Sequence, residues 1–505
     1  MRTIRHYVDL RATEQPDAPY LVAPETGAAM SYHELQRASR ELGLFLLGQG
    51  LQTGDKVALM LHNSYQSARL LIGTMYAGFT VVPLNLLLQR SQLEYVIDHS
   101  DSLLVFTSDE LAPRVREALA GLQRRVKVVV IDADAARSSW DAAPVRHGGA
   151  DLPLVTEEHE SLLMYTSGTT GKPKGVLHTH RSVVAGGEYT SAAHRLTRED
   201  RVLCALPLYH INGQIVTGVA PLVHGGSVVM PHRFSVSDYW QHVSHYQCTW
   251  INVVPTIIAY LLNAPDPRPS GLDISRVKFC RSASAPLPPE LHRAFEQKFG
   301  ISVIETFGMT ETNAPCFSNP YEPARRKIGS PGQAYGNEAK IIDARNGAAQ
   351  PPGTEGEIML RGDNVMKCYY KDPENTARTL QHDGWMHSGD LGYMDEDGFV
   401  FVTGRIKELI IKGGENIAPR EIDEALLKHP AVLEAAAVGI PDPLYGQEIM
   451  ACVVLKAGTH CTTNELNEFC ERELGKYKAP KVLKIVDALP KGPSGKVQRL
   501  RLLEN

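Results

Sequence analysis

Short apolar segments alternate with helical segments through the first 150 residues, and this alternation constrains the fold more than any other feature. The segment from Ser31 to Leu46 begins with a plausible N-cap serine and places apolar side chains at helical spacing. The apolar segment 67–76 predicts a second helix. Short buried strands are predicted at 56–61, 80–83, 103–107 and 126–131. Strands that alternate with helices predict βαβ units and largely parallel sheets.

The same alternation continues further along the chain and then changes character. Strands are predicted at 201–206, 227–230 and 249–254. From about 325 to 403, short alternating segments separated by Gly, Pro and Asp predict a β-rich subdomain. Beyond residue 405 a unit of about 100 residues has the length of an independent small domain. It is predicted to contain helices at 419–428 and 463–474 and strands at 432–438 and 450–455.

Composition narrows the class of protein. At 505 residues the chain is longer than one hydrophobic core usually serves, so two or more domains are expected. A hydrophobic fraction of 43%, a charged fraction of 22% and a net charge of -5 are ordinary for a soluble protein. This charge gives no reason to expect nucleic acid or an anionic membrane as a partner.

Targeting and cysteine patterns favour a cytoplasmic protein. The first ten residues have no apolar core long enough for a signal peptide, and no run of about 18 apolar residues predicts a membrane span. The C-terminal residues match no peroxisomal or endoplasmic-reticulum signal. Eight cysteines lie far apart without the spacing of a zinc site, so buried free thiols in a reducing compartment are expected.

The segment from Thr166 to Gly175 is the strongest chemical signal in the chain. It combines three glycines, four hydroxyl side chains and two lysines. Glycines let backbone N–H groups approach an anion, hydroxyls donate hydrogen bonds and lysines supply charge, so the loop suits a polyphosphate. It is not a Walker A loop, because Pro173 follows Lys172 where that motif has Ser or Thr. A flexible surface linker is the alternative, but linkers seldom place two lysines around a proline and then enter an apolar strand.

The loop resembles the signature of the adenylate-forming superfamily of acyl-CoA synthetases, adenylation domains and luciferases. Further segments resemble motifs of this family in the expected order, so the resemblance covers nearly the whole chain. They are 206–210 (LPLYH), 284–287 (SAPL), 305–311 (ETFGMTE), 383–390 (DGWMHSGD), 404–419 and 489–498 (LPKGPSGKVQ). The family fold implied is α/β. A large N-terminal domain, 1–405, has two parallel α/β sheets and the β-rich subdomain, and a small mobile α+β domain, 406–505, follows.

The resemblance implies a role for each matching residue. Thr310 would contact the α-phosphate, Glu311 would hold Mg²⁺, His210 would position or gate the acyl group, and Lys496 would reach the reacting carboxylate and α-phosphate. Phe307 stands where tyrosine is frequent, so stacking on adenine is kept while a phenolic hydrogen bond is lost. The implied ATP site comprises Thr166, Ser167, Gly168, Thr169, Thr170, Gly171, Lys172, Lys174, Ser284, Ala285, Pro286, Phe307, Thr310, Asp390, Arg405 and Lys496. In this set the carboxylate of Asp390 would accept hydrogen bonds from both ribose hydroxyls.

The implied activity is a two-step reaction with ATP, Mg²⁺ and coenzyme A. The acid is first converted to acyl-AMP with release of pyrophosphate. The C-terminal domain then rotates about Lys407 and presents Gly413 and Gly414 to the pantetheine arm of coenzyme A. A carrier-protein thiol as acceptor and a catalytically silent nucleotide-binding homologue are the alternatives. A monomer or homodimer is expected.

The acid itself is less constrained by the sequence. The resemblance implies an acyl pocket containing Ile211, Asn212, Gln214, Asn252, Ser282 and Met309. Local segments, among them 281–284 (RSAS) and 309–312 (MTET), resemble oxalate-type and carnitine-type ligases most. The amides favour a short or polar acid if they face the pocket. If they pair with backbone groups instead, this argument is lost.

Overall fold

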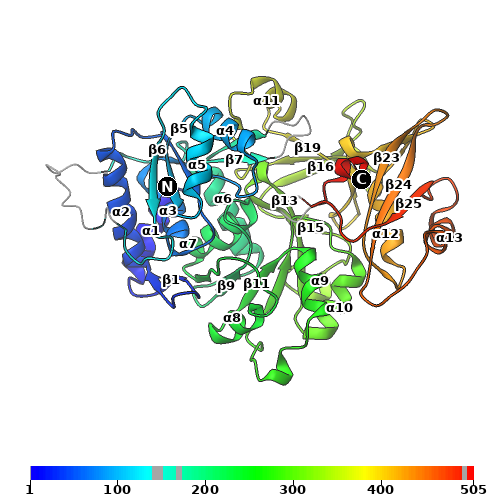
Figure 1. Ribbon diagram of the computed structural model, residues 1–505, viewed down its shortest axis with the longest axis horizontal. Helices are drawn as coiled ribbons and strands as arrows, with labels where there is room; N and C mark the ends of the chain where they lie inside the picture. Colours follow the sequence, from blue (N-terminus) through cyan, green and yellow to red (C-terminus); the bar gives the residue numbers. More distant parts are fainter. Residues whose placement is uncertain (1, 139–140, 142–151, 167–172, 492–496, 505) are drawn as a thin grey trace.

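Seven strands of the described residues form the first sheet. The computed structural model describes residues 2–138, 141, 152–166, 173–491 and 497–504. The strands of this sheet are β3 (Lys56–Met60), β4 (Thr80–Pro83), β5 (Ser102–Ser108), β6 (Lys127–Ile131), β7 (Glu160–Thr166), β8 (Lys174–Thr179) and β18 (Cys368–Tyr369). Their order is β18-β8-β7-β4-β3-β5-β6 (Figure 1). The strands from β7 to β6 run parallel, and β8 is antiparallel to both of its neighbours, β7 and β18.

The second sheet joins a parallel half to an antiparallel half. Its parallel strands are β1 (Pro19–Val22), β9 (Arg201–Cys204), β10 (Ser227–Val229), β11 (Trp250–Val253), β12 (Phe279–Ser282) and β13 (Val303–Met309). Antiparallel neighbours are β2 (Ala29–Ser31), β14 (Ala314–Ser318), β15 (Gly332–Ala334), β16 (Glu338–Ile342), β17 (Gly356–Arg361), β19 (Met386–Met394) and β20 (Phe399–Arg405). The predicted β-rich subdomain therefore continues the second sheet, because β14 turns back along β13 and starts the antiparallel half.

Helices α3 (Tyr65–Ala77) and α6 (His180–Ala193) pack between the two sheets. Every residue of α3 is buried, including the polar side chains of Gln66 and Arg69. The predicted helix after Ser31 is α2 (Tyr32–Gly48), and it begins with a capping box. The backbone N–H of Glu34 donates to the Ser31 hydroxyl, and the backbone N–H of Ser31 donates to the Glu34 carboxylate. The remaining N-terminal helices are α1 (Ile4–Glu14), α4 (Arg90–His99), α5 (Ala112–Leu119), the π-helix η2 (Asn212–Val219), α7 (Ala220–His224), α8 (Tyr239–His245), α9 (Pro255–Asn263), α10 (Pro289–Phe299) and α11 (Pro373–Thr379).

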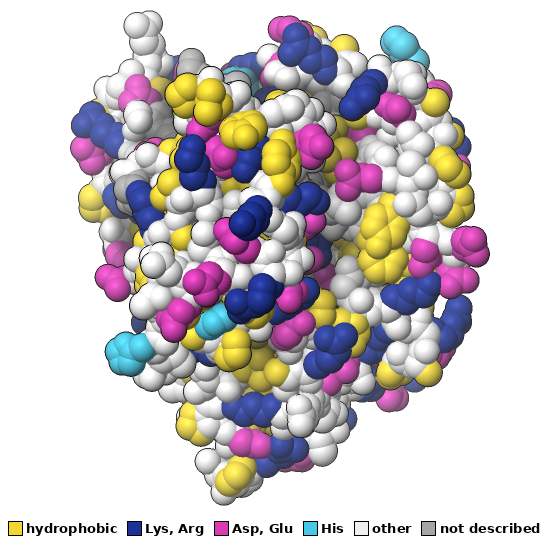
Figure 2. Space-filling view, turned by 90° about the vertical axis from the view of Figure 1, so that its right-hand side faces the viewer, with side chains coloured by type: hydrophobic (Ala, Val, Ile, Leu, Met, Phe, Trp, Pro, Cys, Tyr) yellow, Lys and Arg dark blue, Asp and Glu magenta, His cyan; other side chains and the backbone are white. Residues whose placement is uncertain are grey.

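The C-terminal residues form a third sheet with its own hydrophobic core (Figure 1). Its strands are β21 (Ile410–Lys412), β22 (Glu415–Ile417), β23 (Val432–Asp442), β24 (Gly446–Leu455) and β25 (Val482–Ile485), with helices α12 (Pro419–Leu427) and α13 (Thr463–Leu474). Short 3₁₀ segments are η3 (Arg268–Ser270), η4 (Thr310–Thr312), η5 (Pro323–Arg325), η6 (Ile406–Glu408) and η7 (Arg499–Glu504). Figure 2 shows that charges of both signs are interspersed on this side of the molecule.

Two sequence expectations about the surface and the thiols can be compared with the structure. In the part of the chain that the structure describes, no helix combines the length and the apolar character needed to cross a bilayer. All eight cysteines are free, and six of them are buried. The predicted free thiols are confirmed.

Candidate active site

The base of the Gly/Thr-rich loop is a β-hairpin. Strands β7 and β8 are antiparallel, and Thr166 pairs with Lys174 at the open end of the hairpin. The predicted phosphate ligands Ser167, Gly168, Thr169, Thr170, Gly171 and Lys172 lie outside the described residues. Lys174 extends its ammonium over the ring of Tyr369, 5.0 Å from the centroid. Burial, followed by the nearby charge of Lys407, lowers the pKa of Lys174.

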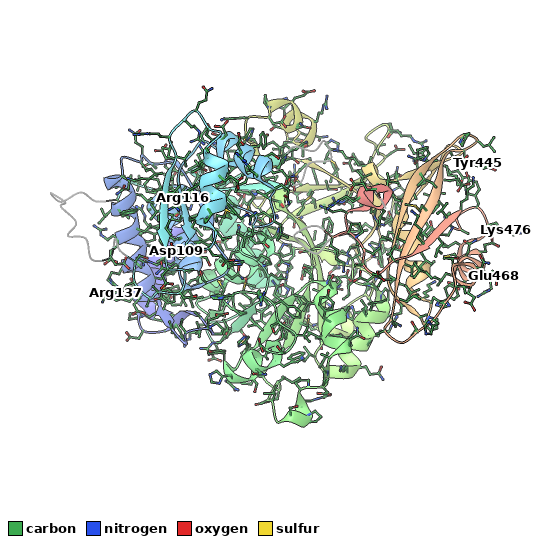
Figure 3. The ribbon with its side chains drawn as sticks, viewed as in Figure 1. Asp109, Arg116, Arg137, Tyr445, Glu468 and Lys476 are labelled. Atoms are coloured by element: carbon green, nitrogen blue, oxygen red, sulfur yellow. The ribbon has the colours of Figure 1, made fainter. Side chains whose placement is uncertain are left out.

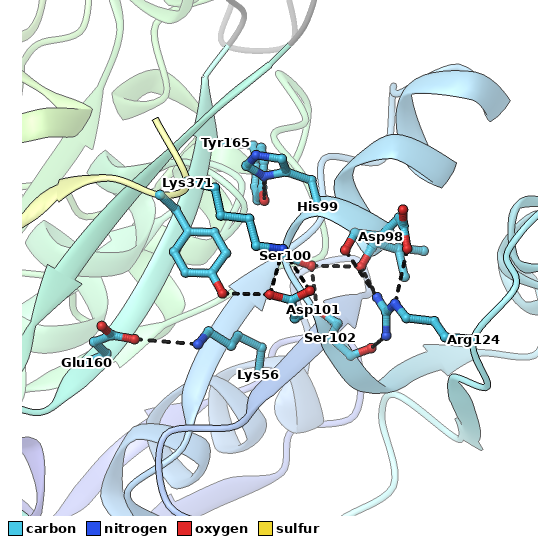
Figure 4. Close-up of polar contacts among 12 residues, drawn as sticks. Lys56, Asp98, His99, Ser100, Asp101, Ser102, Arg124, Glu160, Tyr165 and Lys371 are labelled. Atoms are coloured by element: carbon cyan, nitrogen blue, oxygen red, sulfur yellow. Dashed lines mark hydrogen bonds and ion pairs between the residues drawn. The ribbon is translucent and has the colours of Figure 1, made fainter. Parts of the chain in front are cut away.

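A polar cluster fastens this hairpin to the connection between α4 and β5 (Figure 4). His99 Nδ1 lies 2.8 Å from the hydroxyl of Tyr165, the penultimate residue of β7. Tyr370 donates its hydroxyl to Asp101 at 2.7 Å, and Lys371 donates to the other oxygen of Asp101 at 2.8 Å. The base of the predicted phosphate loop is therefore held from two directions.

Glu311 lies in the 3₁₀ turn η4, next to strand β18 of the first sheet. The Tyr369 hydroxyl donates a 2.9 Å hydrogen bond to Glu311 Oε1. The backbone N–H of Met366 donates to the Glu311 carbonyl at 2.7 Å. The other carboxylate oxygen of Glu311 accepts no hydrogen bond from the described residues. One oxygen is thus positioned by tyrosine while the second is available to a ligand.

A buried histidine orients the turn that carries Thr310. His178 Nε2 lies 2.9 Å from the Thr310 carbonyl oxygen, and Asn313 Nδ2 contacts His178 Nδ1. A carbonyl can only accept, so Nε2 carries the proton and Nδ1 accepts from the amide. Burial lowers the pKa of His178 to about 3, so the ring is neutral at pH 7. The amide of Asn313 thus supports the turn that carries Thr310.

Asp390 and Arg405 meet as partners on adjacent antiparallel strands. They pair in register between β19 and β20, and Arg405 Nε donates to Asp390 Oδ1 at 2.9 Å. Asp390 is 2% exposed, whereas the Arg405 side chain is 47% exposed. The carboxylate of Asp390 raises the pKa of Arg405. This contact joins the two residues that the resemblance assigns to the ribose and phosphate.

The segment predicted to contact adenine follows β12. Ser284 has a left-handed φ of 73° and accepts a 3.0 Å hydrogen bond from Asn212 Nδ2. Ala285 and Pro286 continue this loop toward α10. Phe307 lies on β13, the neighbour of β12, and packs on Phe317 with a centroid separation of 5.7 Å.

His210 and the first predicted acyl-pocket residues lie at the start of a π-helix. β9 ends at Cys204, so His210 lies beyond the strand and its carbonyl accepts from Gln214 N–H at 3.1 Å. Gln214 Nε2 donates to the Leu208 carbonyl, so this amide pairs with backbone. Ile211 precedes η2, and Ser282 and Met309 end β12 and β13. Ser282 pairs with Glu305 and lies on the opposite face of β12 from Arg281.

Asn212 and Asn252 both contact Arg281, the first residue of the 281–284 segment. Arg281 Nη1 donates to Asn212 Oδ1 and to Asn252 Oδ1, both at 2.8 Å. Asn252 Nδ2 donates to Asn212 Oδ1 at 3.0 Å. The amides therefore differ in what they contact. Those of Asn212 and Asn252 contact Arg281, while Gln214 bonds a backbone carbonyl and Asn313 bonds His178.

The predicted coenzyme A face is the β21–β22 hairpin. Gly413 and Gly414 form its turn with φ angles of 57° and 87°. A Cβ on Gly413 would lie 2.9 Å from the Tyr477 hydroxyl and 3.2 Å from the Tyr445 ring, so this position requires glycine. Figure 3 shows Tyr445 at the tip of the C-terminal sheet, in the turn between β23 and β24. Lys407 lies in η6 between the second and third sheets, and Lys496 lies outside the described residues.

Comparisons with known proteins agree with this arrangement. The family model of the AMP-binding enzyme matches residues 8–370, and that of the AMP-binding enzyme C-terminal domain matches residues 421–496. The chain belongs to the AMP-binding enzyme family. A sulfoacetate–CoA ligase of Cupriavidus necator is 54% identical over 100% of this chain and 98% of its own length. An oxalate–CoA ligase of Arabidopsis thaliana is 36% identical over 89% of this chain and 88% of its own length.

The solved structures show the same fold along the full chain. ATP-bound MatB from Rhodopseudomonas palustris has a TM-score of 0.90, 30% identity and 98% coverage of both chains. The AMP-binding enzyme described here is an acyl-CoA synthetase that activates a carboxylic acid through its adenylate. The carrier-protein and silent-homologue alternatives are not favoured. Enzymes of this kind use ATP, coenzyme A and Mg²⁺.

Sequence reasoning about this AMP-binding enzyme missed two residues. Tyr369 carries no motif that distinguishes it from the adjacent Tyr370, and only the structure brings it to Glu311. Arg281 had a signal, because a charged side chain interrupts the apolar strand 279–282 and is 2% exposed. The segment 281–284 was compared with other ligases as a whole, so Arg281 was not singled out as a candidate ligand of the acid.

Proposed function

We propose that this acyl-CoA synthetase acts on sulfoacetate or another short acid with a second anionic group. The observation that carries the proposal is the orientation of Asn212 and Asn252, which make the predicted acyl pocket polar. A long alkyl chain would place apolar surface against this buried cluster of amides and the Arg281 guanidinium and would pair with none of its polar groups. The relative from Cupriavidus necator, a sulfoacetate–CoA ligase, supports the same class of acid.

In the first half-reaction an oxygen of the acid carboxylate attacks the α-phosphorus of ATP. The bond to the β-phosphate oxygen breaks, and pyrophosphate leaves with that electron pair. Asp390 would orient the ribose, and Lys174 with the other polar residues of the 166–175 loop would bind the departing phosphates. Lys496 would neutralise charge at the reacting carboxylate and α-phosphate.

Glu311 fits the Mg²⁺ ligand that the resemblance implies. A carboxylate is a hard oxygen ligand, and Tyr369 holds one of its two oxygens while the other stays available. Among the described residues no group of three or more His, Cys, Asp and Glu could hold a metal ion. One carboxylate together with nucleotide phosphates is the usual way in which proteins hold this ion. When bound, Mg²⁺ would neutralise charge on the phosphates.

In the second half-reaction the thiolate of coenzyme A attacks the acyl carbon, and AMP leaves from the tetrahedral intermediate. Rotation of residues 406–505 about Lys407 would replace Lys496 by the Gly413–Gly414 turn. The absence of side chains there would let the pantetheine arm pass close to the backbone. His210 would position the acyl group between adenylate and thiol.

The test is acid-dependent AMP release with and without coenzyme A. Sulfoacetate and acetate form a matched pair that differs in the sulfonate, and oxalate and octanoate test a second carboxylate and a long chain. We expect kcat/KM for sulfoacetate to exceed that for acetate by about 100-fold or more, because a site built for a polar group rejects the analogue without it. Equal or better use of acetate or octanoate contradicts the proposed substrate.

A further inference from the structure

Arg281 is one of two arginines among the largest completely buried side chains of the described residues; the other is Arg69. Arg69 is 1% exposed and meets Asp141, whose two oxygens accept from its two terminal nitrogens, one of them at 2.8 Å. This is the usual way in which a buried guanidinium is compensated. Arg69 is therefore a buried arginine whose charge is neutralised by a carboxylate within the fold.

Arg281 lacks such a counter-ion. Its hydrogen bonds from Nη1 go to the neutral amide oxygens of Asn212 and Asn252, and its Nε has no partner among the described residues. No described carboxylate lies within 4.0 Å of it. Burial lowers the pKa of Arg281 to about 9, and no acidic group opposes this shift. At pH 7 the guanidinium is still charged.

The position of Arg281 is one at which α/β sheets bind ligands. Asn252 on β11 pairs in register with Arg281 on β12, which pairs with Ile304 on β13. Thr306 is two residues beyond Ile304 and so lies on the same face. Asn252 and Arg281 thus lie near the carboxyl ends of β11 and β12, and Thr306 lies where the parallel pairing of β13 with β12 ends. Ligands bind at this edge of open α/β sheets.

The cluster connects directly to the predicted nucleotide site. Asn212 accepts from Arg281 and donates to Ser284, the first residue of the segment predicted to contact adenine. Thr306 is 3% exposed, and its hydroxyl has no hydrogen-bond partner among the described residues. Two buried donors, the guanidinium and this hydroxyl, are therefore left for a ligand next to the adenylate.

We infer that Arg281 binds the second anionic group of the acid, a sulfonate or a second carboxylate, and determines the specificity of the enzyme for such acids. The inference rests on the proposed function and names the residue that recognises the substrate. Asn212 and Asn252 orient the guanidinium, and Thr306 donates a further hydrogen bond to the same group. A monoanionic aliphatic acid leaves the buried charge unpaired, so it is rejected as well as poorly bound.

The experiment compares kcat/KM for sulfoacetate, oxalate and acetate in Arg281→Gln, Arg281→Lys and the wild type. We expect Arg281→Gln to lower the ratio of sulfoacetate to acetate by at least about 30-fold, because truncation of a buried charge pair weakens binding strongly. Arg281→Lys keeps the charge and retains part of the ratio. The sulfoacetate and oxalate arms show which anionic group the cluster accepts better.

A second variant avoids the risk that Arg281→Gln does not fold. Asn252→Asp is isosteric and places a carboxylate 2.8 Å from Arg281 Nη1, at the position of the present amide oxygen. This internal counter-ion competes with the substrate anion, so the ratio of sulfoacetate to acetate falls. Arg326→Gln is the matched control, because among the described residues the Arg326 guanidinium donates only to the backbone carbonyls of Val303, Pro320 and Tyr321. Its ratio stays at the wild-type value.

The outcomes separate the two proposals. A wild-type enzyme that does not prefer sulfoacetate or oxalate to acetate overturns the proposed substrate class. A wild type that prefers them while Arg281→Gln and Asn252→Asp keep the wild-type ratio overturns the role of Arg281 and leaves the substrate class standing. A ratio that falls in both variants and not in Arg326→Gln supports the inference.

Discussion

At the scale of single residues, the proposed ATP site depends on side chains that hold its predicted ligating residues in place and have no predicted contact with ATP or Mg²⁺ themselves. Tyr369 donates to Glu311, and the aromatic ring of Tyr369 also lies beneath the ammonium of Lys174. One tyrosine therefore contacts both the proposed Mg²⁺ ligand Glu311 and the proposed phosphate-binding residue Lys174. Outer partners of this kind fix the orientation of the ligand they contact.

Tyr369→Phe keeps the ring and removes only the hydrogen bond to Glu311. We expect the Mg²⁺ concentration for half-maximal AMP release to rise by about 10-fold, since loss of an outer partner weakens metal binding by such factors. Tyr370→Phe is the matched control, because its hydroxyl bonds Asp101. An identical Mg²⁺ dependence in Tyr369→Phe and the wild type speaks against the positioning role.

At the scale of elements, the short 3₁₀ segment η6 connects two sheets with separate cores. Its lysine, Lys407, is exposed and its charge contributes to the lowered pKa of Lys174. The connection thus lies beside the predicted phosphate site in the observed arrangement. A segment of three residues can absorb a domain rotation only through large changes in φ and ψ.

Lys407→Pro should slow formation of the thioester more than formation of the adenylate. Proline fixes its own φ and restricts Ile406, which opposes the rotation but not the arrangement needed for the first step. Acid-dependent ATP–pyrophosphate exchange measures the first step, and release of acyl-CoA measures the second. Lys407→Ala removes the charge without stiffening the backbone and serves as the control. Losses of equal size in both steps count against the proposed hinge.

At the scale of the whole molecule, three histidines are buried in neutral form at the junction of the two large sheets. Burial lowers the pKa of His178, His180 and His194 to about 3. Their pKa in the unfolded chain is about 6.5. Between these values the unfolded chain binds protons that the folded chain does not, so stability is present above about pH 6.5 and declines as the pH falls toward 3.

The free energy of unfolding should fall between pH 7 and pH 5 by roughly 2 kcal/mol for each of these histidines. Urea unfolding at both pH values measures the change. His194→Phe keeps the stacking on Trp250 and Phe279 and removes one titrating group, so its loss on acidification should be smaller by that amount. If the variant and the wild type show the same pH dependence, the loss of stability on acidification comes from groups other than His194.

The sequence by itself determined the local elements and the family. Periodic apolar positions and cap residues predicted α2 and α13 close to their observed bounds. These two signals depend only on neighbours a few residues away in the sequence. The order of the motifs identified the adenylate-forming family, and the comparison with CoA ligases decided between coenzyme A and the alternatives. The antiparallel half of the second sheet was predicted as β-rich, but its attachment to β13 depends on strand pairing across the chain.

Only the tertiary structure decided which side chains complete the site. Tyr369 meets Glu311 across 58 positions, and Arg281 meets Asn212 across 69. A pattern of residue types records how often apolar positions recur, but it does not record which side chains meet at such separations. Whether a buried arginine has a counter-ion is a property of that packing. Arg69 has a carboxylate partner and Arg281 has none among the described residues, and no segment of sequence distinguishes them.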